Sequence, residues 1–509
     1  MSHDRELHPA DQRLLDAALQ QLLRARPAPA LATPTPAPVE RTRRTPLLTA
    51  ALFLFGLSIT AMMLLQAKND RAAPAQPTPT QPLPTPIQDR EPSPLPPSVT
   101  AKGRAELEGL PDDTVNLVLW PHALGDLKLL PRLRALRRLQ IVVPSSGTGG
   151  KLAQLLVDWK RLPDDTLAPL ADLPALECLG LPSPLHLRAD LLTPLQRCPR
   201  LCRLDLVGEN VVIGDDLVAA MAALPGLRAL ALDIVTLDGK AMRRLATLPL
   251  TELEIRRCPA FDAEAFEALC SMRSLESLVL QDLGRRDFYG GDGKGLLWRA
   301  TAADLEKLAR LPQLRTLRLQ SCAIGTEELQ ALPTGLHELQ LRATDLDADG
   351  YRELRRFGEL RHLDISTAKH SHFLGMSESL AQQSAKADAL AEALGTMRLR
   401  SLSFDGYATA ALLEQLALQP DLARLELRLY ERLSLEPLAG MRQLREFELF
   451  QNRIPSTLTL DDLEPLRTCT GLRQLTLRLC NSELEAKAIE KLLGHDVEVR
   501  LHVTRFKEK

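Results

Sequence analysis

One short pattern, L-x-x-L-x-L, recurs along this chain and constrains its fold more than any other feature. Three clear copies are centred on Leu317, Leu339 and Leu363, at spacings of 22 and 24 residues. The L-x-L half has the period of a strand whose apolar side chains lie on one side. Stretches between copies, such as 325–333 (GTEELQALP), repeat apolar residues at helical spacing. One strand and one helix cannot bury their apolar sides alone, so stacked copies must form the core.

The same pattern extends over most of the chain. Further copies are centred on Leu139, Leu179, Leu204, Leu230, Leu253, Leu278, Leu402, Leu425, Phe447 and Leu475, with weaker end strands at 114–120 and 497–503. About 15 strands are therefore predicted between residues 105 and 505, most of them 22 to 28 residues apart. Three longer gaps, of 39 or 40 residues, follow Leu139, Leu278 and Leu363. The pattern resembles that of leucine-rich repeat proteins. The resemblance implies an α/β solenoid with a curved parallel sheet on its concave side and helices on its convex side.

The family pattern places Asn or Cys three residues after the last leucine, where the side chain bonds to turn backbone inside the stack. Cys258, Cys322, Asn452 and Cys480 occupy that position here, whereas Glu209 and Tyr407 depart from it. The departures favour the helix-containing subtype, similar to ribonuclease-inhibitor-like or cysteine-containing-like repeats. All eight cysteines lie in the repeat region and none forms a CxxC pair. We expect buried thiols that pack as small apolar groups. Disulfide bonds are the alternative if the compartment is oxidising.

An apolar stretch of 19 residues without a charge, Leu47–Leu65, precedes the repeats. At 1.5 Å per residue it is long enough for the hydrocarbon core of a bilayer. Arg41, Arg43 and Arg44 precede it, so the positive-inside rule places the N-terminus in the cytoplasm and the repeats in the periplasm or outside the cell. A cleaved signal peptide and a buried core helix are the rival interpretations. The abundance of Arg, Ala, Leu and Pro is typical of a bacterial source, and an envelope location follows.

These features divide the chain into four parts. Residues 1–45 are predicted to be a cytoplasmic tail with a short amphipathic helix at Asp11–Arg24, and residues 46–66 a single transmembrane helix. Residues 67–101 are rich in proline and form an extended linker, and residues 102–509 form the repeat domain. The tail helix is a candidate docking site for a cytoplasmic partner.

No catalytic signature is found in the sequence. The GGDGKG run at 290–295 lacks the spacing of a phosphate loop, and His370 and His372 have no acidic or cysteine partner nearby. A net charge of −2 and an aromatic content of 4% argue against nucleic acid as a partner. We therefore predict a non-enzymatic protein without cofactor or metal.

The remaining functional candidates are the residues between the leucines, which point away from the core onto the concave sheet. The density of charged outward residues is highest between Arg318 and Phe450. We therefore predict that this region forms a groove for a protein or peptide ligand. The candidate binding residues are Arg318, Gln320, Glu338, Gln340, Arg342, His362, Asp364, Arg424, Glu426, Arg428, Glu446, Glu448 and Phe450. The primary hypothesis is a membrane-anchored interaction module. The alternative is a transmembrane signalling regulator, anti-sigma-like or receptor-like, that couples the repeats to a cytoplasmic partner through the tail helix.

Overall fold

The computed structural model describes residues 97–505 except 122–123, 143–161, 164, 182–186, 209–210, 284–299, 323, 343, 345, 367–378, 430–432, 452–456 and 495. The chain divides into two units, residues 1–90 and 91–509, and every described residue belongs to the second. The tail helix at 11–24, the apolar stretch at 47–65 and most of the linker therefore lie outside the described residues. None of the helices that are described has the length and apolar content needed to cross a bilayer.

A single parallel sheet of 16 strands, arranged in the order of the sequence, runs through the repeat domain. The strands are β1 Val99–Lys102, β2 Asn116–Trp120, β3 Arg138–Ile141, β4 Cys178–Leu181, β5 Arg203–Val207, β6 Ala229–Asp233, β7 Glu252–Arg256, β8 Ser277–Gln281, β9 Thr316–Gln320, β10 Glu338–Arg342, β11 His362–Ser366, β12 Ser401–Asp405, β13 Arg424–Leu429, β14 Glu446–Gln451, β15 Gln474–Cys480 and β16 Glu498–Thr504. The predicted α/β solenoid with a parallel sheet is confirmed. The sheet has one strand more than the expected number of about 15, because β1 (VTAK) lacks the leucine pair that marks the others and falls where the linker was expected to end.

The leucines of successive repeats form continuous rows in the core. Leu317 of β9 lies opposite Leu339 of β10, and Leu339 lies opposite Leu363 of β11. All three are at most 1% exposed. Burying one leucine side chain stabilises a fold by about 1.5–3 kcal/mol. A slip of one residue in any strand would turn its leucines toward solvent, so the rows fix the register.

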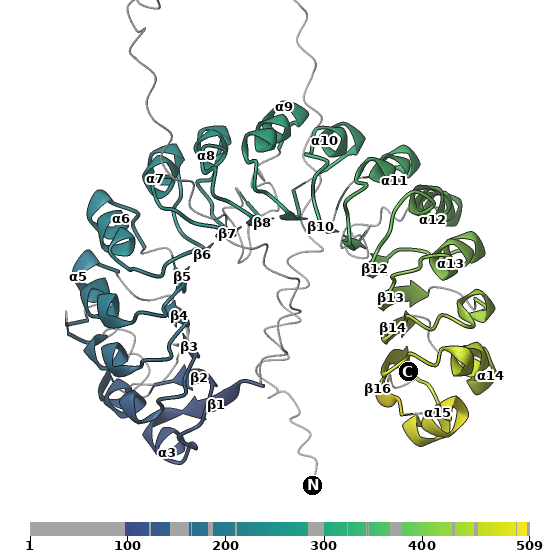
Figure 1. Ribbon diagram of the computed structural model, residues 1–509, viewed down its shortest axis with the longest axis horizontal. Helices are drawn as coiled ribbons and strands as arrows, with labels where there is room; N and C mark the ends of the chain where they lie inside the picture. The colour runs from purple at the N-terminus through teal and green to yellow at the C-terminus, as the bar shows by residue number, and fades with distance from the viewer. Residues whose placement is uncertain are drawn as a thin grey trace, which may run out of the picture. The chain divides into compact units, whose positions relative to one another are not determined.

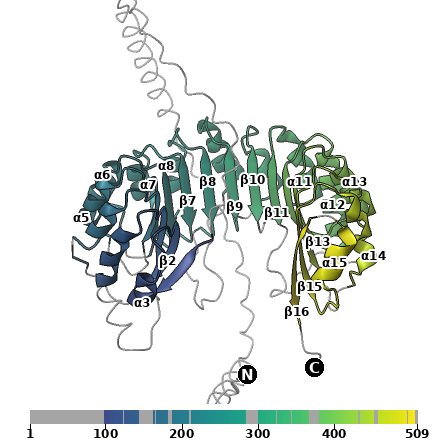
Figure 2. The ribbon, with the colours of Figure 1, turned by 60° about the horizontal axis from the view of Figure 1, so that its bottom comes forward.

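The helices lie on the outer side of the arc that the strands line on the inside (Figures 1 and 2). The α-helices are α3 Gly103–Glu108, α5 Ala189–Leu192, α6 Asp215–Ala222, α7 Gly239–Leu245, α8 Ala263–Leu269, α9 Ala302–Leu305, α10 Thr326–Gln330, α11 Ala348–Glu353, α12 Leu380–Leu394, α13 Ala410–Ala417, α14 Leu460–Leu463 and α15 Ala486–Leu493. Short 3₁₀ helices alternate with them or follow them: η1 Leu124–Arg132, η2 Ala168–Asp172, η3 Thr193–Arg197, η4 Glu306–Arg310, η5 Leu354–Arg356, η7 Glu436–Leu438 and η8 Glu464–Thr468. The expectation of a helix-containing repeat is confirmed, although many repeats carry only a single turn.

Side-chain caps start several of these helices. The carboxylates of Asp238, Asp262 and Asp347 each accept a bond from the backbone N–H three residues later, at 2.8 to 2.9 Å. Such caps are worth about 1 kcal/mol each and set where the chain turns from strand into helix. The helix in the gap after Leu363, α12, is the longest among the described residues, with 15 residues.

The turn after a strand is the same in several repeats. Arg257 and Ser321, each directly after a strand, have positive φ angles of 50° and 57°. The next residues are Cys258 and Cys322, which turn inward and are at most 2% exposed. Each thiol donates to the carbonyl two residues before it, at 3.3 Å in both cases. The two cysteines therefore bond turn backbone inside the stack, as the repeat pattern implied.

Candidate functional site

The thirteen predicted binding residues all lie at outward positions of the concave sheet. β9 supplies Arg318 and Gln320, β10 supplies Glu338, Gln340 and Arg342, β11 supplies His362 and Asp364, β13 supplies Arg424, Glu426 and Arg428, and β14 supplies Glu446, Glu448 and Phe450. They alternate with buried apolar side chains, most of them leucines, along each strand. The strands are adjacent apart from β12, which adds Ser401, Ser403 and Asp405 to the same face. The predicted set thus shares one surface, and its binding role stays a prediction.

Ion pairs between strands neutralise much of this face. Arg318 pairs with Glu338 at 2.7 Å and Arg342 with Asp364 at 2.6 Å. Further along the sheet, Arg428 pairs with Asp405 at 2.9 Å and Arg478 with Glu448 at 2.5 Å. The Arg428 guanidinium also lies 4.5 Å from the ring centroid of Phe450. These pairs are partly exposed, so each stabilises the fold by about 1 kcal/mol or less. Their main effect is to leave little free charge where they occur.

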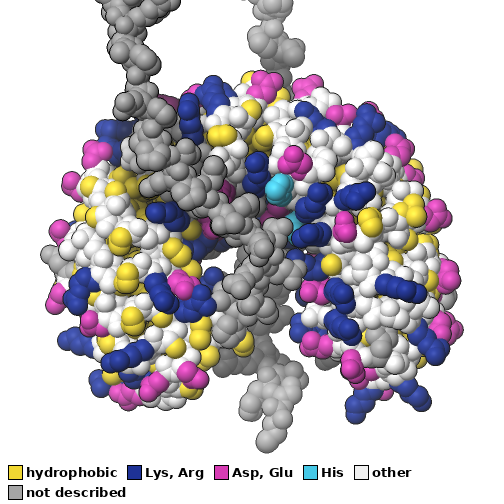
Figure 3. Space-filling view, in the orientation of Figure 1, with side chains coloured by type: hydrophobic (Ala, Val, Ile, Leu, Met, Phe, Trp, Pro, Cys, Tyr) yellow, Lys and Arg dark blue, Asp and Glu magenta, His cyan; other side chains and the backbone are white. Residues whose placement is uncertain are grey.

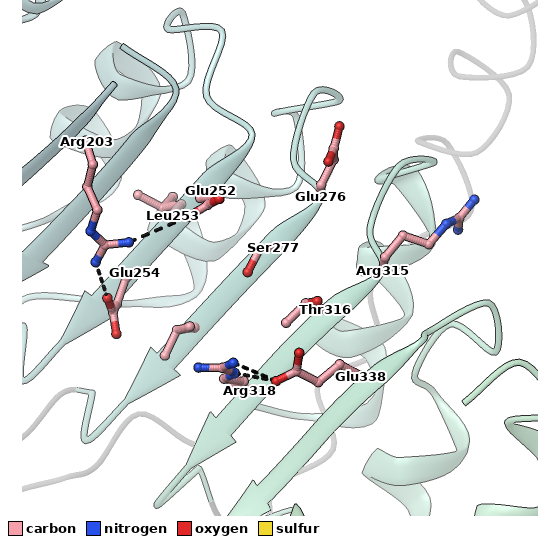
Figure 4. Close-up of a pocket in the computed structure, with 11 residues that line it drawn as sticks. Arg203, Glu252, Leu253, Glu254, Glu276, Ser277, Arg315, Thr316, Arg318 and Glu338 are labelled. Atoms are coloured by element: carbon pink, nitrogen blue, oxygen red, sulfur yellow. Dashed lines mark hydrogen bonds and ion pairs between the residues drawn. The ribbon is translucent and has the colours of Figure 1, made fainter. Parts of the chain in front are cut away.

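A shallow hollow of about 400 Å³ lies over β7 to β10 (Figure 4). We call it the central hollow. Its middle is formed by Ser277, Val279 and Thr316, and an ion-paired group borders it on each side. Figure 4 shows Arg203 reaching toward Glu254 on one side and Arg318 toward Glu338 on the other. The charges of these four side chains are therefore paired within the protein.

The Arg203 group spans three strands. Arg203 on β5 donates to Asp205 on the same strand and to Glu254 on β7, both at 2.8 Å. The intervening strand, β6, presents Ala229 and Ala231, which are too short to block the path. Glu254 is 12% exposed and Arg203 is 26% exposed, so the pair is largely shielded from water. Burial raises the pKa of Asp205, although the charge of Arg203 opposes that rise.

A second hollow, of about 130 Å³, lies over β12 to β15, and we call it the acidic hollow. Three carboxylates, from Glu426, Glu446 and Glu448, face a single lining arginine, Arg424. Glu448 is held by Arg478, whereas Glu426 and Glu446 make no ion pair with any residue that the structure describes. Partial removal of water raises the pKa of Glu426, and repulsion from Glu448 and Asp364 adds to the rise although Ser403 donates a hydrogen bond. The acidic hollow thus carries uncompensated negative charge.

Sequence reasoning selected the residues of the acidic hollow but left out most of the central hollow. Glu276 and Arg315 line the central hollow from the position just before a strand, where the pattern gave no reason to look. Arg203, Glu252 and Glu254 are outward strand residues outside the selected region. The short side chains of Ala229 and Ala231, on a strand between two charged strands, are the sequence signal for the ion pair between Arg203 and Glu254.

Two cysteines meet at the N-terminal end of the same face. Cys178 begins β4, opposite Arg203 of β5, and Cys202 directly precedes that arginine. A hydrogen bond from the Cys202 thiol lowers the pKa of Cys178 to about 6, and Arg138 and Arg203 contribute to the lowering. All eight cysteines are free thiols, five of them buried and Cys178, Cys202 and Cys480 only partly buried. The expectation of buried apolar thiols therefore holds for five of the eight.

A metal site is not found in the part of the chain that the structure describes. No group of three or more His, Cys, Asp or Glu side chains is arranged there to hold a metal ion. His370, His372 and the GGDGKG run lie outside the described residues.

Comparisons with known proteins found likeness only at the level of structure. Neither the family models nor the curated proteins gave a match. Three solved structures, each 15% identical, are an internalin from Listeria monocytogenes (TM-score 0.28, 66% of this chain and 72% of that chain), TLR13 in its complex with ssRNA13 (0.36, 81% and 66%) and Rad7 in the yeast complex of Rad7 and Elc1 (0.39, 64% and 79%). The repeat pattern and the 16 parallel strands make the described part of this chain a solenoid of strand-and-helix repeats.

Proposed function

We propose that this protein is a non-enzymatic interaction module, anchored in a bacterial cytoplasmic membrane through Leu47–Leu65, whose concave sheet binds a protein or peptide outside that membrane. The apolar stretch and the arginines before it support the anchor and its orientation. The sheet supports the binding role, because solenoids of this kind offer an extended concave surface.

The acidic hollow carries this proposal. Elsewhere on the face most charged side chains form ion pairs with neighbouring strands, whereas Glu426 and Glu446 form none with a described residue. A ligand that places a lysine or arginine in the hollow would supply the missing counter-charge and form charge-assisted hydrogen bonds. The Phe450 ring lies against the Arg428 guanidinium of the neighbouring strand and offers apolar contact beside the acidic hollow. We therefore propose a ligand segment with a basic residue next to an apolar one.

A displayed library of random peptides, selected on the full chain, tests this proposal. We expect the selected peptides to be enriched in lysine or arginine. Replacing Glu426 and Glu446 together by Gln should weaken the selected peptides about tenfold or more, because it removes two charged partners. The control is Glu490→Gln on the convex helix α15, where the side chain is exposed and away from the sheet, and it should change nothing. Selection of acidic peptides, or equal binding by the double variant, would sink the proposed ligand class.

The anchor is tested separately by flotation of the full chain with neutral phosphatidylcholine vesicles. We expect the full chain to float with the vesicles and a chain lacking residues 47–65 to remain at the bottom of the gradient. Reporter fusions at each end of the chain then give the orientation. A full chain that stays soluble would rule out the anchor and leave the binding proposal standing.

A further inference from the structure

A row of basic side chains lies at the N-terminal edge of the sheet, and one of them, Arg315, also lines the central hollow. The residue directly before the strand is basic at six of the seven strands from β9 to β15: Arg315, His337, Arg361, Arg400, Arg445 and Arg473. The exception is β13, which follows Ala423. The first residues of these strands are in register, from Thr316 of β9 to Gln474 of β15. The basic residues therefore stand at one level, and we call the five arginines the arginine row.

Three arginines of the row, Arg315, Arg361 and Arg445, donate hydrogen bonds to backbone carbonyls. Arg315 donates to the carbonyls of Leu314 and Gly335, both at 3.4 Å. Arg361 donates to the carbonyls of Leu360 at 3.2 Å and Arg398 at 3.3 Å. None of the five arginines makes an ion pair with a residue that the structure describes. Carbonyl bonds thus hold three of the guanidinium groups in place and leave their charges uncompensated.

The loops that lead from helix to strand also carry more arginines than carboxylates. The seven such loops before β9 to β15 contain seven arginines and only two carboxylates, Glu359 and Asp421. The corresponding loops before β2 to β8 contain five arginines and four carboxylates. Figure 3 views this side of the domain, where Lys and Arg side chains follow the inner rim of the C-terminal half. The basic charge is thus concentrated in one half of one edge.

The geometry of this edge fits a flat anionic surface. Side chains at one level, carried by parallel strands that start together, can all approach a plane at once. The loops before β9 to β15 contain one aromatic residue, Phe357, and it is fully buried, so bases would find no ring to stack on. Because all the strands are parallel, β1 also starts at this edge, and the chain enters the domain there at Val99. The 33 residues from 66 to 98 span at most about 110 Å, which is ample for the domain to reach a membrane that holds Leu47–Leu65.

We propose that the arginine row docks the repeat domain onto the anionic lipid headgroups of a bilayer. The docking extends the membrane anchoring proposed above. Docked in this way, the strands point away from the bilayer, and the concave sheet with its acidic hollow stays open at the side. Basic residues near an anionic membrane each contribute enough attraction for about a fivefold change in partition.

The test uses a chain lacking residues 47–65, which keeps every described residue and removes the apolar anchor. Its sedimentation with vesicles of phosphatidylcholine alone is compared with that of vesicles containing phosphatidylglycerol. We expect binding only to the anionic vesicles, and we expect added salt to weaken it. Replacing the five arginines of the row by Gln should lower the partition more than 100-fold. Replacing them by Lys should leave most of the binding, because the charge is kept.

A matched control separates position from total charge. Arg256, Arg318, Arg342, Arg428 and Arg478 lie on the sheet face, and replacing these five by Gln changes the net charge by the same amount. This control should lose less than fivefold. Equal losses in the two Gln variants would overturn the proposal, and so would a Lys variant that fails as badly as the row Gln variant. A single-stranded oligonucleotide that displaces the protein from vesicles and binds more tightly would instead make the row a polyphosphate site. None of these outcomes depends on the anchor, which the flotation of the full chain tests by itself.

Discussion

The central hollow and the acidic hollow share one sheet and one core but differ in the state of their charges. Around the central hollow, Arg203 and Arg318 are each held by a carboxylate of another strand. In the acidic hollow, Glu426 and Glu446 have no such partner among the described residues. The difference comes from the neighbouring strands, because two alanines on β6 open a path for Arg203, whereas Arg424 lines the acidic hollow without forming an ion pair with either glutamate. Whether an outward charge is available to a ligand is therefore decided across strands.

The largest effects should be equal in the two hollows, because the same leucine rows lie beneath both. Leu280→Ala under the central hollow and Leu449→Ala beside the acidic hollow remove fully buried side chains. Each should lower the free energy of unfolding by about 3 kcal/mol, measured by urea titration with circular dichroism. Val212→Ala, at a side chain that is 72% exposed, should change it by less than about 0.5 kcal/mol. A strong loss at only one leucine would mean that the two halves do not share a continuous core.

Removing one carboxylate from each hollow should give effects of opposite sign. Glu254→Gln breaks a shielded bond to Arg203 and should destabilise the protein by about 1.5 kcal/mol at neutral pH. Glu426→Gln should stabilise it slightly, by less than about 1 kcal/mol, because it removes an unpaired and partly exposed charge. Denaturant titrations of both variants at low salt measure the difference. Two losses of similar size would show that Glu426 has a partner after all.

The pH dependence of the Glu426 effect follows from the direction of its shift. Its pKa is raised in the folded protein above the ordinary value of 4.5. The folded state then binds the proton more tightly than the unfolded state, so the stability that Glu426 contributes is lost as pH rises from below 4.5 through the folded pKa. The stabilising effect of Glu426→Gln should accordingly be present at neutral pH and disappear below pH 4.5. A constant effect across that range would contradict the shift.

Blocking the path over β6 should break the ion pair between Arg203 and Glu254. The central hollow would then carry unpaired charge, as the acidic hollow does. The substitution Ala231→Val places a branched side chain between Arg203 and Glu254. The coupling energy of that pair, measured by a double-mutant cycle with Arg203→Gln and Glu254→Gln, should be about 1 kcal/mol in the native background and near zero in the Ala231→Val background. Ala220→Val, on the outer helix α6, is the control and should leave the coupling intact. An undiminished coupling would mean that Arg203 takes another path.

The smallest effect on stability, but a clear one on reactivity, is expected at the cysteine pair. With a pKa of about 6, Cys178 should be alkylated by iodoacetamide at neutral pH. The rate of this alkylation should fall as the pH is lowered, with a midpoint near pH 6. Cys258, whose pKa is raised to about 12 by burial, should stay unmodified in the folded protein. Cys202→Ala should move the Cys178 midpoint upward, because the hydrogen bond from Cys202 is the largest cause of the low pKa. Peptide mass mapping of the alkylated protein reads both sites, and equal rates at Cys178 and Cys258 would refute the assignment.

The sequence allowed the sheet, its order and the direction of its outward residues to be predicted, because each depends on a local period that stacking repeats. The missed strand, β1, shows the limit of that reasoning, since VTAK pairs with β2 without the leucines that define the pattern. The thirteen candidate binding residues were placed on one face by alternation alone. Their partners were not predictable, because Arg342 meets Asp364, 22 residues away, only through the register of two neighbouring strands.

By itself, the sequence of this protein determined a solenoid: leucines spaced for a strand and a helix, repeated until their rows close a core. Only the tertiary structure decided which charges are paired and which are free. Arg203 is bound because alanines occupy the strand beside it, whereas the arginines of the row form no ion pair with a described residue. Periodicity lies within one segment of chain, whereas a charge finds or misses its partner across segments that only folding brings together.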